Sequence, residues 1–207
     1  MELATAAAFR KDPALVWGWY EWRRAKVAMA EPNEAHRALA QLQAARPQTI
    51  VVTQNVDDLH ERAGSRNVLH LHGSLFAPRC ARCGQRHVFA ATPAMEPEGG
   101  RHIAPPVCVA CGGKVRPGVV WFGEPLSPTT WSKAEAAAAN CDLLMVVGTS
   151  GLVQPAANLA SIGRRAGAFV VVIDPHPTAI DAICTHRLQG KAGEVLPRLL
   201  QQARIIA

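Results

Sequence analysis

Two pairs of cysteines with the spacing C-x2-C are the clearest chemical feature of this sequence. The four residues are Cys80, Cys83, Cys108 and Cys111. Four thiolates at this spacing bind Zn²⁺ tetrahedrally and fill its coordination shell, which leaves no position for water or substrate. A glycine, Gly84 or Gly112, follows each pair and eases the tight turn beneath the metal. We therefore predict one structural zinc ion, with two disulfides or four unrelated buried thiols as the alternative.

A second group of residues follows short apolar runs. Its members are Gln54, Asn55 and Asp57, then His72, then Gly148, Thr149 and Ser150, then Asp174, Pro175 and His176. Ligands bind beyond the C-terminal ends of strands in open α/β sheets, and the backbone N–H groups of such loops bind phosphate. The pattern predicts a nucleotide-binding cleft. Ordinary strand-to-helix turns capped by polar side chains are the alternative at each position.

The elements that must position these residues alternate between strands and helices. We predict helices over 12–29, from about 32, over 155–166 and over 194–203, and strands over 49–54, 68–73, 142–148 and 168–174. Such alternation indicates an α/β fold with a doubly wound parallel sheet. Residues from about 80 to 114 lack this periodicity. We therefore predict an α/β domain over 1–73 and 115–207, interrupted by an inserted zinc module over 74–114.

Composition narrows the class of protein. A chain of 207 residues with 49% hydrophobic residues can bury one sizeable core, and its apolar runs are too short to cross a bilayer. Thiolate ligands without an export signal predict a cytoplasmic protein. The net charge of +6 is spread along the chain. A zinc-ribbon protein that binds nucleic acid would instead need clustered cations and stacking aromatic residues near the cysteines, so we expect neither nucleic-acid nor membrane binding.

The motifs together resemble a known family. TQNVDDLHERAG, HLHG, the two C-x2-C pairs, VRPGVVWFGE and GTSGLVQPAA occur in this order across nearly the whole chain. This combination resembles the sirtuins, the NAD-dependent protein lysine deacylases. The resemblance implies a Rossmann-like domain with an inserted zinc domain, NAD as co-substrate, and acylated lysine side chains of proteins as partners. The implied products are nicotinamide and O-acyl-ADP-ribose.

The resemblance also assigns roles to individual residues. His72 matches the catalytic histidine, a general base for a ribose hydroxyl, and His70 is expected to be structural. The nicotinamide end of NAD is assigned to Gln54, Asn55, Val56 and Asp57. The ribose and phosphate are assigned to Gly148, Thr149 and Ser150, and the adenosine to Asp174, Pro175, His176 and Ala192. The edge that pairs with the substrate peptide is assigned to Val119, Val120, Trp121, Phe122, Gly123 and Glu124.

One pair of residues points to the acyl group. Tyr20 and Arg23 are spaced i, i+3, so they share a face of a predicted helix. A phenol and a guanidinium together can bind a carboxylate. The pair resembles that of the sirtuin subgroup that removes succinyl, malonyl or glutaryl groups. In the alternative, Tyr20 packs with neighbouring tryptophans and Arg23 is solvated.

The resemblance also implies a departure at the N-terminus. Sirtuins begin with a strand and a glycine-rich loop that holds the NAD diphosphate, and no such motif precedes Leu3. The sequence therefore predicts that the first strand is missing and that these 207 residues alone bind NAD weakly or not at all. This leaves a second function class open, a non-catalytic remnant that binds acyl-lysine peptides. The sequence does not determine the oligomeric state.

Overall fold

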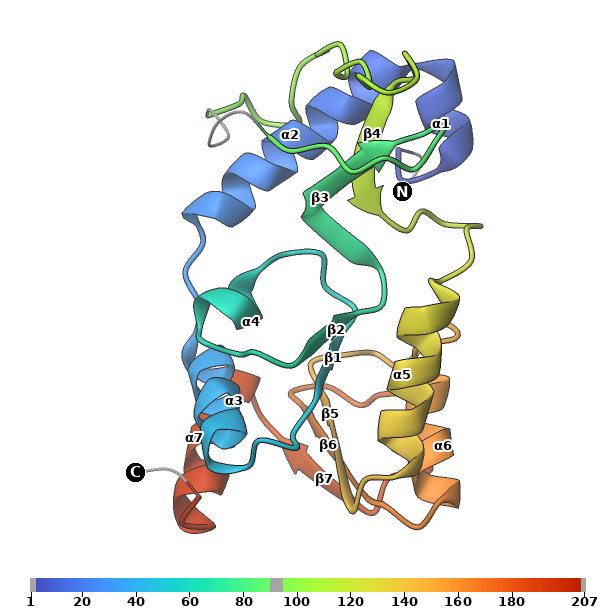
Figure 1. Ribbon diagram of the computed structural model, residues 1–207. Helices are drawn as coiled ribbons and strands as arrows, with labels where there is room; N and C mark the ends of the chain where they lie inside the picture. The colour runs from blue at the N-terminus through green and yellow to red at the C-terminus, as the bar shows by residue number, and fades with distance from the viewer. Residues whose placement is uncertain (1–2, 90–94, 206–207) are drawn as a thin grey trace. The chain divides into compact units, whose positions relative to one another are not determined.

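The computed structural model describes residues 3–89 and 95–205, which form two compact units (Figure 1). Unit 1 comprises residues 1–31, 53–58 and 72–126, and unit 2 comprises residues 32–52, 59–71 and 127–207. Unit 1 contains the elements α1 (Ala6–Lys11), α2 (Pro13–Met29), β3 (Gly73–Cys80) and β4 (Val115–Val119). In the described part of the chain, no helix is long and apolar enough to cross a membrane.

Unit 2 contains most of the alternating elements. They are α3 (Glu34–Ala45), α4 (Leu59–Arg62), β2 (Val68–His70), α5 (Pro128–Ala139), β5 (Leu143–Val147), α6 (Asn158–Arg165), β6 (Phe169–Asp174), β7 (His186–Gln189) and α7 (Ala192–Gln202). Strand β1 (Val51–Thr53) lies where the chain passes from unit 2 to unit 1, and it pairs with β2.

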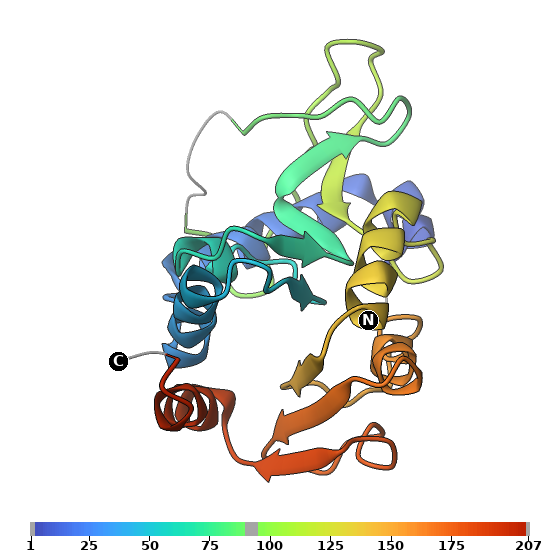
Figure 2. The same cartoon turned by 60° about the horizontal axis from the view of Figure 1, so that its bottom comes forward.

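The parallel sheet β5–β6–β7 has helices on both faces, as the alternating pattern predicts (Figures 1 and 2). Successive side chains of a strand point to opposite faces. In β6, Val171 and Ile173 pack with α3 and α7, whereas Val170 and Val172 pack against Ala160 of α6. Burial on both faces explains why β6 reads as an unbroken apolar run.

Local sequence signals placed two helices correctly. The Asp12 carboxylate caps α2 by accepting a hydrogen bond from the Leu15 N–H at 2.9 Å, and Pro13 occupies the first turn. Asn33 caps α3 through the N–H groups of Ala35 and His36. The sequence missed α1, most of β3, β4, α5 and β7. Helix α5 is rich in alanine and buries only Ala134 and Ala138, so it has no strong apolar stripe to find.

The strand predicted over 68–73 is in fact two strands. β2 ends at His70, Leu71 and His72 form a turn, and β3 begins at Gly73. Gly73 has φ of +75°, and a Cβ there would lie 2.2 Å from the Gly118 carbonyl oxygen. A left-handed glycine redirects the chain at this point, into the antiparallel pair β3–β4. The helix predicted over 155–166 is also shorter, since α6 begins only at Asn158.

The zinc-module boundaries at 74 and 114 stay a prediction, and residues 90–94 of that module lie outside the described residues. Cys80 is the last residue of β3 and pairs with Val115, the first residue of β4. The cysteine pairs are therefore attached to the ends of one antiparallel strand pair.

Residues 95–103 cross α2 in direct backbone contact. A Cβ on Gly18 would lie 1.6 Å from the Arg101 carbonyl oxygen. The crossing is held by hydrogen bonds from the Ile103 N–H to the Ala14 carbonyl at 3.1 Å and between His102 Nε2 and Asp12 Oδ2 at 3.0 Å. Gly18 is thus required by a close approach between two segments.

We expect Gly18→Ala to lower the free energy of unfolding by about 1–3 kcal/mol, because the methyl group overpacks a backbone contact. The matched control is Gly193→Ala in α7, where the added Cβ would have its nearest neighbour at 4.0 Å. That change should be neutral or stabilising by up to about 1 kcal/mol. Denaturant unfolding of both variants checks this; equal effects would contradict the crowding at Gly18.

Candidate active site and metal centre

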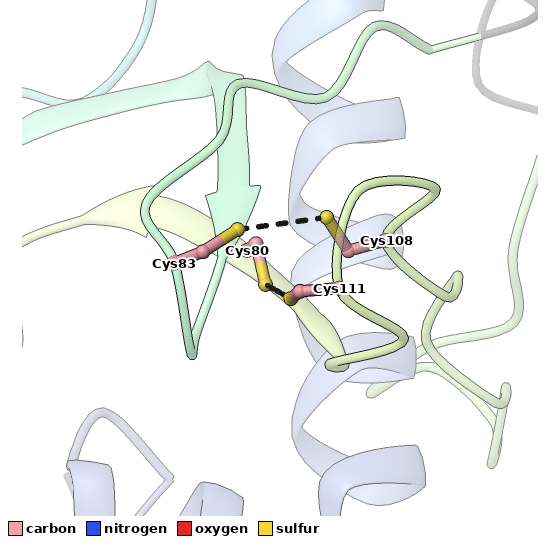
Figure 3. A group of neighbouring side chains, drawn as sticks. All are labelled: Cys80, Cys83, Cys108 and Cys111. Atoms are coloured by element: carbon pink, nitrogen blue, oxygen red, sulfur yellow. Dashed lines mark hydrogen bonds between the residues drawn. The ribbon is translucent and has the colours of Figure 1, made fainter.

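The four predicted zinc ligands lie together in unit 1 (Figure 3). Their Sγ atoms are all within 4.8 Å of one another, with 3.5 Å between Cys80 and Cys111 and 3.7 Å between Cys83 and Cys108. Tetrahedral Zn–S bonds of about 2.3 Å place sulfur atoms about 3.8 Å apart. All four thiols are free, which excludes the disulfide alternative. The cluster therefore fits one zinc ion.

The backbone around the cysteines also fits a metal site. The N–H of Arg82 donates to Cys80 Sγ at 3.3 Å, and the N–H of Gly113 donates to Cys111 Sγ at 3.4 Å. Such bonds stabilise negative charge on a thiolate. Gly84 and Gly112 have φ of +74° and +70°. The turn geometry that the sequence predicts for these two glycines is confirmed.

His72 lies in the turn between β2 and β3, half-buried, with its ring fixed by the backbone. Its Nδ1 is 3.0 Å from the Gln54 carbonyl oxygen. A carbonyl oxygen only accepts, so the neutral ring carries its proton on Nδ1 and donates it to Gln54. Nε2 is then left with a free lone pair. This is the tautomer that a general base needs.

Backbone hydrogen bonds bring the segment after β1 and the residues after β4 to His72. The Leu75 N–H donates to the Val56 carbonyl at 2.8 Å, and the Val120 N–H donates to the His72 carbonyl at 2.8 Å. The Asn55 N–H donates to Thr53 Oγ1 at 3.1 Å. Unit 1 thus holds the predicted base, the predicted nicotinamide segment and the predicted peptide edge together.

His70, the other histidine of the motif, has a different environment. It belongs to unit 2, and its Nε2 lies 2.7 Å from Glu61 Oε1 of α4. This ion-pairing geometry gives His70 a structural partner.

Tyr20 and Arg23 lie on one face of α2, as their spacing predicts. The Tyr20 ring is 4% exposed and belongs to a core that includes Phe9 and Leu75. The Arg23 guanidinium carbon lies 4.9 Å from the centre of the Trp19 ring and 5.7 Å from that of Tyr20. Within residues 3–89 and 95–205, Arg23 forms no ion pair with a carboxylate. Burial raises the pKa of Tyr20, so the phenol keeps its proton at neutral pH.

Trp121 connects the predicted peptide edge to Tyr20. Its indole Nε1–H donates to Tyr20 Oη at 3.1 Å, and its ring is 3% exposed. One contact of the alternative, in which Tyr20 packs with neighbouring tryptophans, is present, since Trp19 meets the Tyr20 ring edge-on at 4.8 Å. Tyr20 is therefore both packed among aromatic rings and adjacent to a cation.

The sequence reasoning missed Arg116, a buried cation that organises this edge. Its guanidinium binds both carboxylate oxygens of Glu124 and lies 3.4 Å from the centre of the Trp121 ring. Burial opposes ionisation of Glu124, but hydrogen bonds from Arg116 and from the Trp121 N–H outweigh it and lower the pKa of that carboxyl. No local pattern marks an arginine inside β4 as buried.

The predicted peptide edge is partly paired within unit 1. The N–H groups of Val120 and Trp121 are bonded to the His72 carbonyl and to Glu124, and that of Phe122 donates to the Ala4 carbonyl at 3.1 Å. A peptide added beside Phe122 would have to displace Ala4 or bond through carbonyl oxygens. Phe122 itself is exposed.

The predicted ribose, phosphate and adenosine residues all belong to unit 2. Gly148 follows β5 with φ of +60°, and its N–H donates to the Ile173 carbonyl of β6 at 3.0 Å. Asp174 ends β6, and its Oδ1 accepts from the His176 N–H at 2.8 Å in a tight turn over Pro175. Ala192 begins α7. The residues predicted to bind ribose and phosphate therefore follow β5, and the Asp174–His176 turn, predicted to bind adenosine, lies at the end of the adjacent strand β6. Both sets lie at the same edge of the parallel sheet.

Comparisons with known proteins identify the family of this chain. The model of the Sir2 family matches residues 1–155. An NAD-dependent protein deacylase of Pseudomonas aeruginosa is 60% identical over 201 residues, which are 97% of this chain and 80% of that protein. The structure of a Sir2 homologue–NAD complex is 46% identical, with a TM-score of 0.89 over 98% of this chain and 77% of the other.

A Sir2 structure with a p53 peptide and NAD⁺ is 29% identical to this chain. Its TM-score is 0.79, over 96% of this chain and 81% of the other. These likenesses confirm the predicted Rossmann-like sirtuin fold, although the described strands form three separate sheets. By the match of its sequence and the geometry of its cysteine cluster, the chain belongs to the Sir2 family.

Proposed function

We propose that this protein is an NAD-dependent protein lysine deacylase with a preference for acyl groups that end in a carboxylate. Its relatives are named NAD-dependent protein deacylases, and one neighbour holds a peptide and NAD⁺. The observation that carries the proposal is the His72 ring, whose Nδ1–H is committed to Gln54. This hydrogen bond supports Nε2 as the nitrogen that acts as the base, because Nδ1 is occupied by its bond to Gln54.

In this proposal several groups of residues contribute to NAD binding. NAD supplies the ribose that accepts the acyl group. His72 Nε2 takes a proton from a ribose hydroxyl, and the Gln54–Asp57 segment surrounds the nicotinamide end. The Gly148–Ser150 turn offers backbone N–H groups to the ribose and phosphate, and the Asp174–His176 turn and Ala192 lie near the adenosine. The cysteines hold zinc and take no part in the chemistry.

The acyl preference rests on two hydrogen-bond donors of α2. Tyr20 Oη accepts from Trp121, and none of the residues that the structure describes accepts the hydroxyl hydrogen of Tyr20. Arg23 has no carboxylate partner in the same part of the chain. A succinyl, malonyl or glutaryl carboxylate could take both donors, and a cation beside a carboxylate gives strong charge-assisted hydrogen bonds.

We expect Arg23→Ala and Tyr20→Phe to lower the ratio of desuccinylation to deacetylation. The expected loss is about tenfold or more for Arg23→Ala, because a charge-assisted hydrogen bond is removed, and less for Tyr20→Phe. Steady-state kinetics on one peptide, carrying succinyl-lysine or acetyl-lysine, measures the ratio. Equal losses of both activities would contradict the carboxylate-binding role and favour a purely packed Tyr20.

The proposal as a whole is tested by NAD-dependent release of the acyl group by the purified chain. Product analysis should find nicotinamide and O-acyl-ADP-ribose in equal amounts. Peptide binding without turnover would instead favour the non-catalytic remnant.

A further inference from the structure

Trp121 belongs to the predicted peptide edge, yet its side chain is directed into the protein. The indole ring is buried, and its only polar atom is bonded to Tyr20 Oη, a residue 101 positions away. An indole N–H can donate but cannot accept. The bond therefore restricts the direction of the Tyr20 hydroxyl hydrogen, because that hydrogen cannot point at Trp121.

The position of Trp121 is fixed from three sides. Arg116 lies over one face of the ring, and Phe9 packs against the ring with centroids 5.3 Å apart. The Trp121 backbone N–H donates to Glu124 Oε2 at 2.9 Å. Glu124 is held in turn by the two-pronged hydrogen bonds of Arg116. A ring held in this way has little freedom to reorient, so its N–H stays directed at Tyr20 Oη.

We propose that Trp121 is a specificity-determining residue that acts through Tyr20. By occupying the acceptor side of the Tyr20 hydroxyl, its N–H makes that hydroxyl a donor toward the acyl group, beside Arg23. A carboxylate accepts from such a donor, whereas the methyl end of an acetyl group does not. The Arg116–Glu124 pair maintains this orientation by fixing the Trp121 ring. This inference rests on the proposed deacylase function and refines its acyl selectivity.

The proposal predicts a loss of selectivity in Trp121→Phe, which keeps an aromatic ring but removes the N–H. The ratio of succinyl to acetyl kcat/KM should fall about threefold to tenfold, mainly through KM for the succinyl peptide. Damage to the peptide edge would affect both substrates and cancel in the ratio. Trp131→Phe in α5 is the matched control, and its ratio should equal that of the wild type.

A double-mutant cycle separates this role from general packing. In the Tyr20→Phe background, Trp121→Phe should leave the ratio unchanged, because no hydroxyl remains to orient. The proposal would be overturned if Trp121→Phe lowered the ratio equally in the wild type and in Tyr20→Phe. It would also be overturned if Trp121→Phe alone left the ratio unchanged.

A second measurement, the titration of Tyr20, does not depend on activity. Tyr20 is the single tyrosine of the sequence. The phenolate absorbance of the folded protein therefore reports Tyr20 alone. Burial raises its pKa, and the Trp121 N–H opposes that effect by stabilising the phenolate. The titration midpoint should therefore move to higher pH in Trp121→Phe but not in Trp131→Phe, with circular dichroism confirming the fold. An unmoved midpoint would show that the bond does not form.

The two proposals can fail separately. If the wild type prefers succinyl-lysine and Trp121→Phe keeps that preference, only the role of Trp121 is wrong. If the wild type neither turns over nor binds the succinyl peptide in calorimetry, both proposals are wrong. If it binds without turnover, the ratio of the two dissociation constants replaces the kinetic ratio and decides the role of Trp121.

Discussion

His72→Ala is expected to lower NAD-dependent deacylation by about 10²–10⁴-fold, the usual contribution of general base catalysis. The loss should appear in kcat, since the ring contributes a proton acceptor at Nε2 and a single hydrogen bond to Gln54. Steady-state kinetics with succinyl and acetyl peptides measures the effect. Both substrates should lose activity equally, because the proposed base acts on the ribose and not on the end of the acyl chain.

The matched control is His70→Ala, two residues earlier in the same motif. His70 lies beside Glu61, so its removal costs a partly exposed hydrogen bond and should leave turnover within about twofold of the wild type. A large loss in His70→Ala, or retained activity in His72→Ala, would contradict the assignment of the base. Circular dichroism of both variants shows whether the fold is kept.

The zinc cluster is the second site with a large expected effect. Structural zinc ions bind with about 10–16 kcal/mol, which is comparable to the net stability of a domain, about 5–15 kcal/mol. Cys108→Ser removes a buried ligand, so we expect loss of the metal and of the folded state of unit 1. Deacylation should then be lost as well, because His72 and Tyr20 belong to the same unit.

Zinc content and thermal unfolding of purified Cys108→Ser measure this effect. The control is Cys184→Ser in unit 2, whose thiol donates to the Asp181 carbonyl and lies outside the cluster. That variant should keep one zinc per chain and nearly unchanged unfolding. A Cys108→Ser protein that still binds one zinc ion and unfolds like the wild type would contradict the four-cysteine site.

Structural features that depend only on residues close together in the chain were predictable from the sequence. The C-x2-C spacing fixes two ligands on one tight turn, and the glycines after each pair adopt the positive φ that such turns need. The caps of α2 and α3 are likewise formed by side chains within three residues of the helix start. The alternating burial of β6 follows from the geometry of a strand between two helical layers.

The sequence by itself thus determined the family, the metal ligands, the candidate base and most elements of the parallel sheet. Only the tertiary structure decided the orientation of the candidate base and of the side chains proposed to bind the acyl group. The Nδ1 partner of His72 is 18 residues away, and Trp121 and Tyr20 are 101 residues apart. Such contacts depend on how whole helices and strands pack, and no local pattern of residues encodes that packing. The same holds for the burial of Arg116 and for the close approach of Gly18 to Arg101.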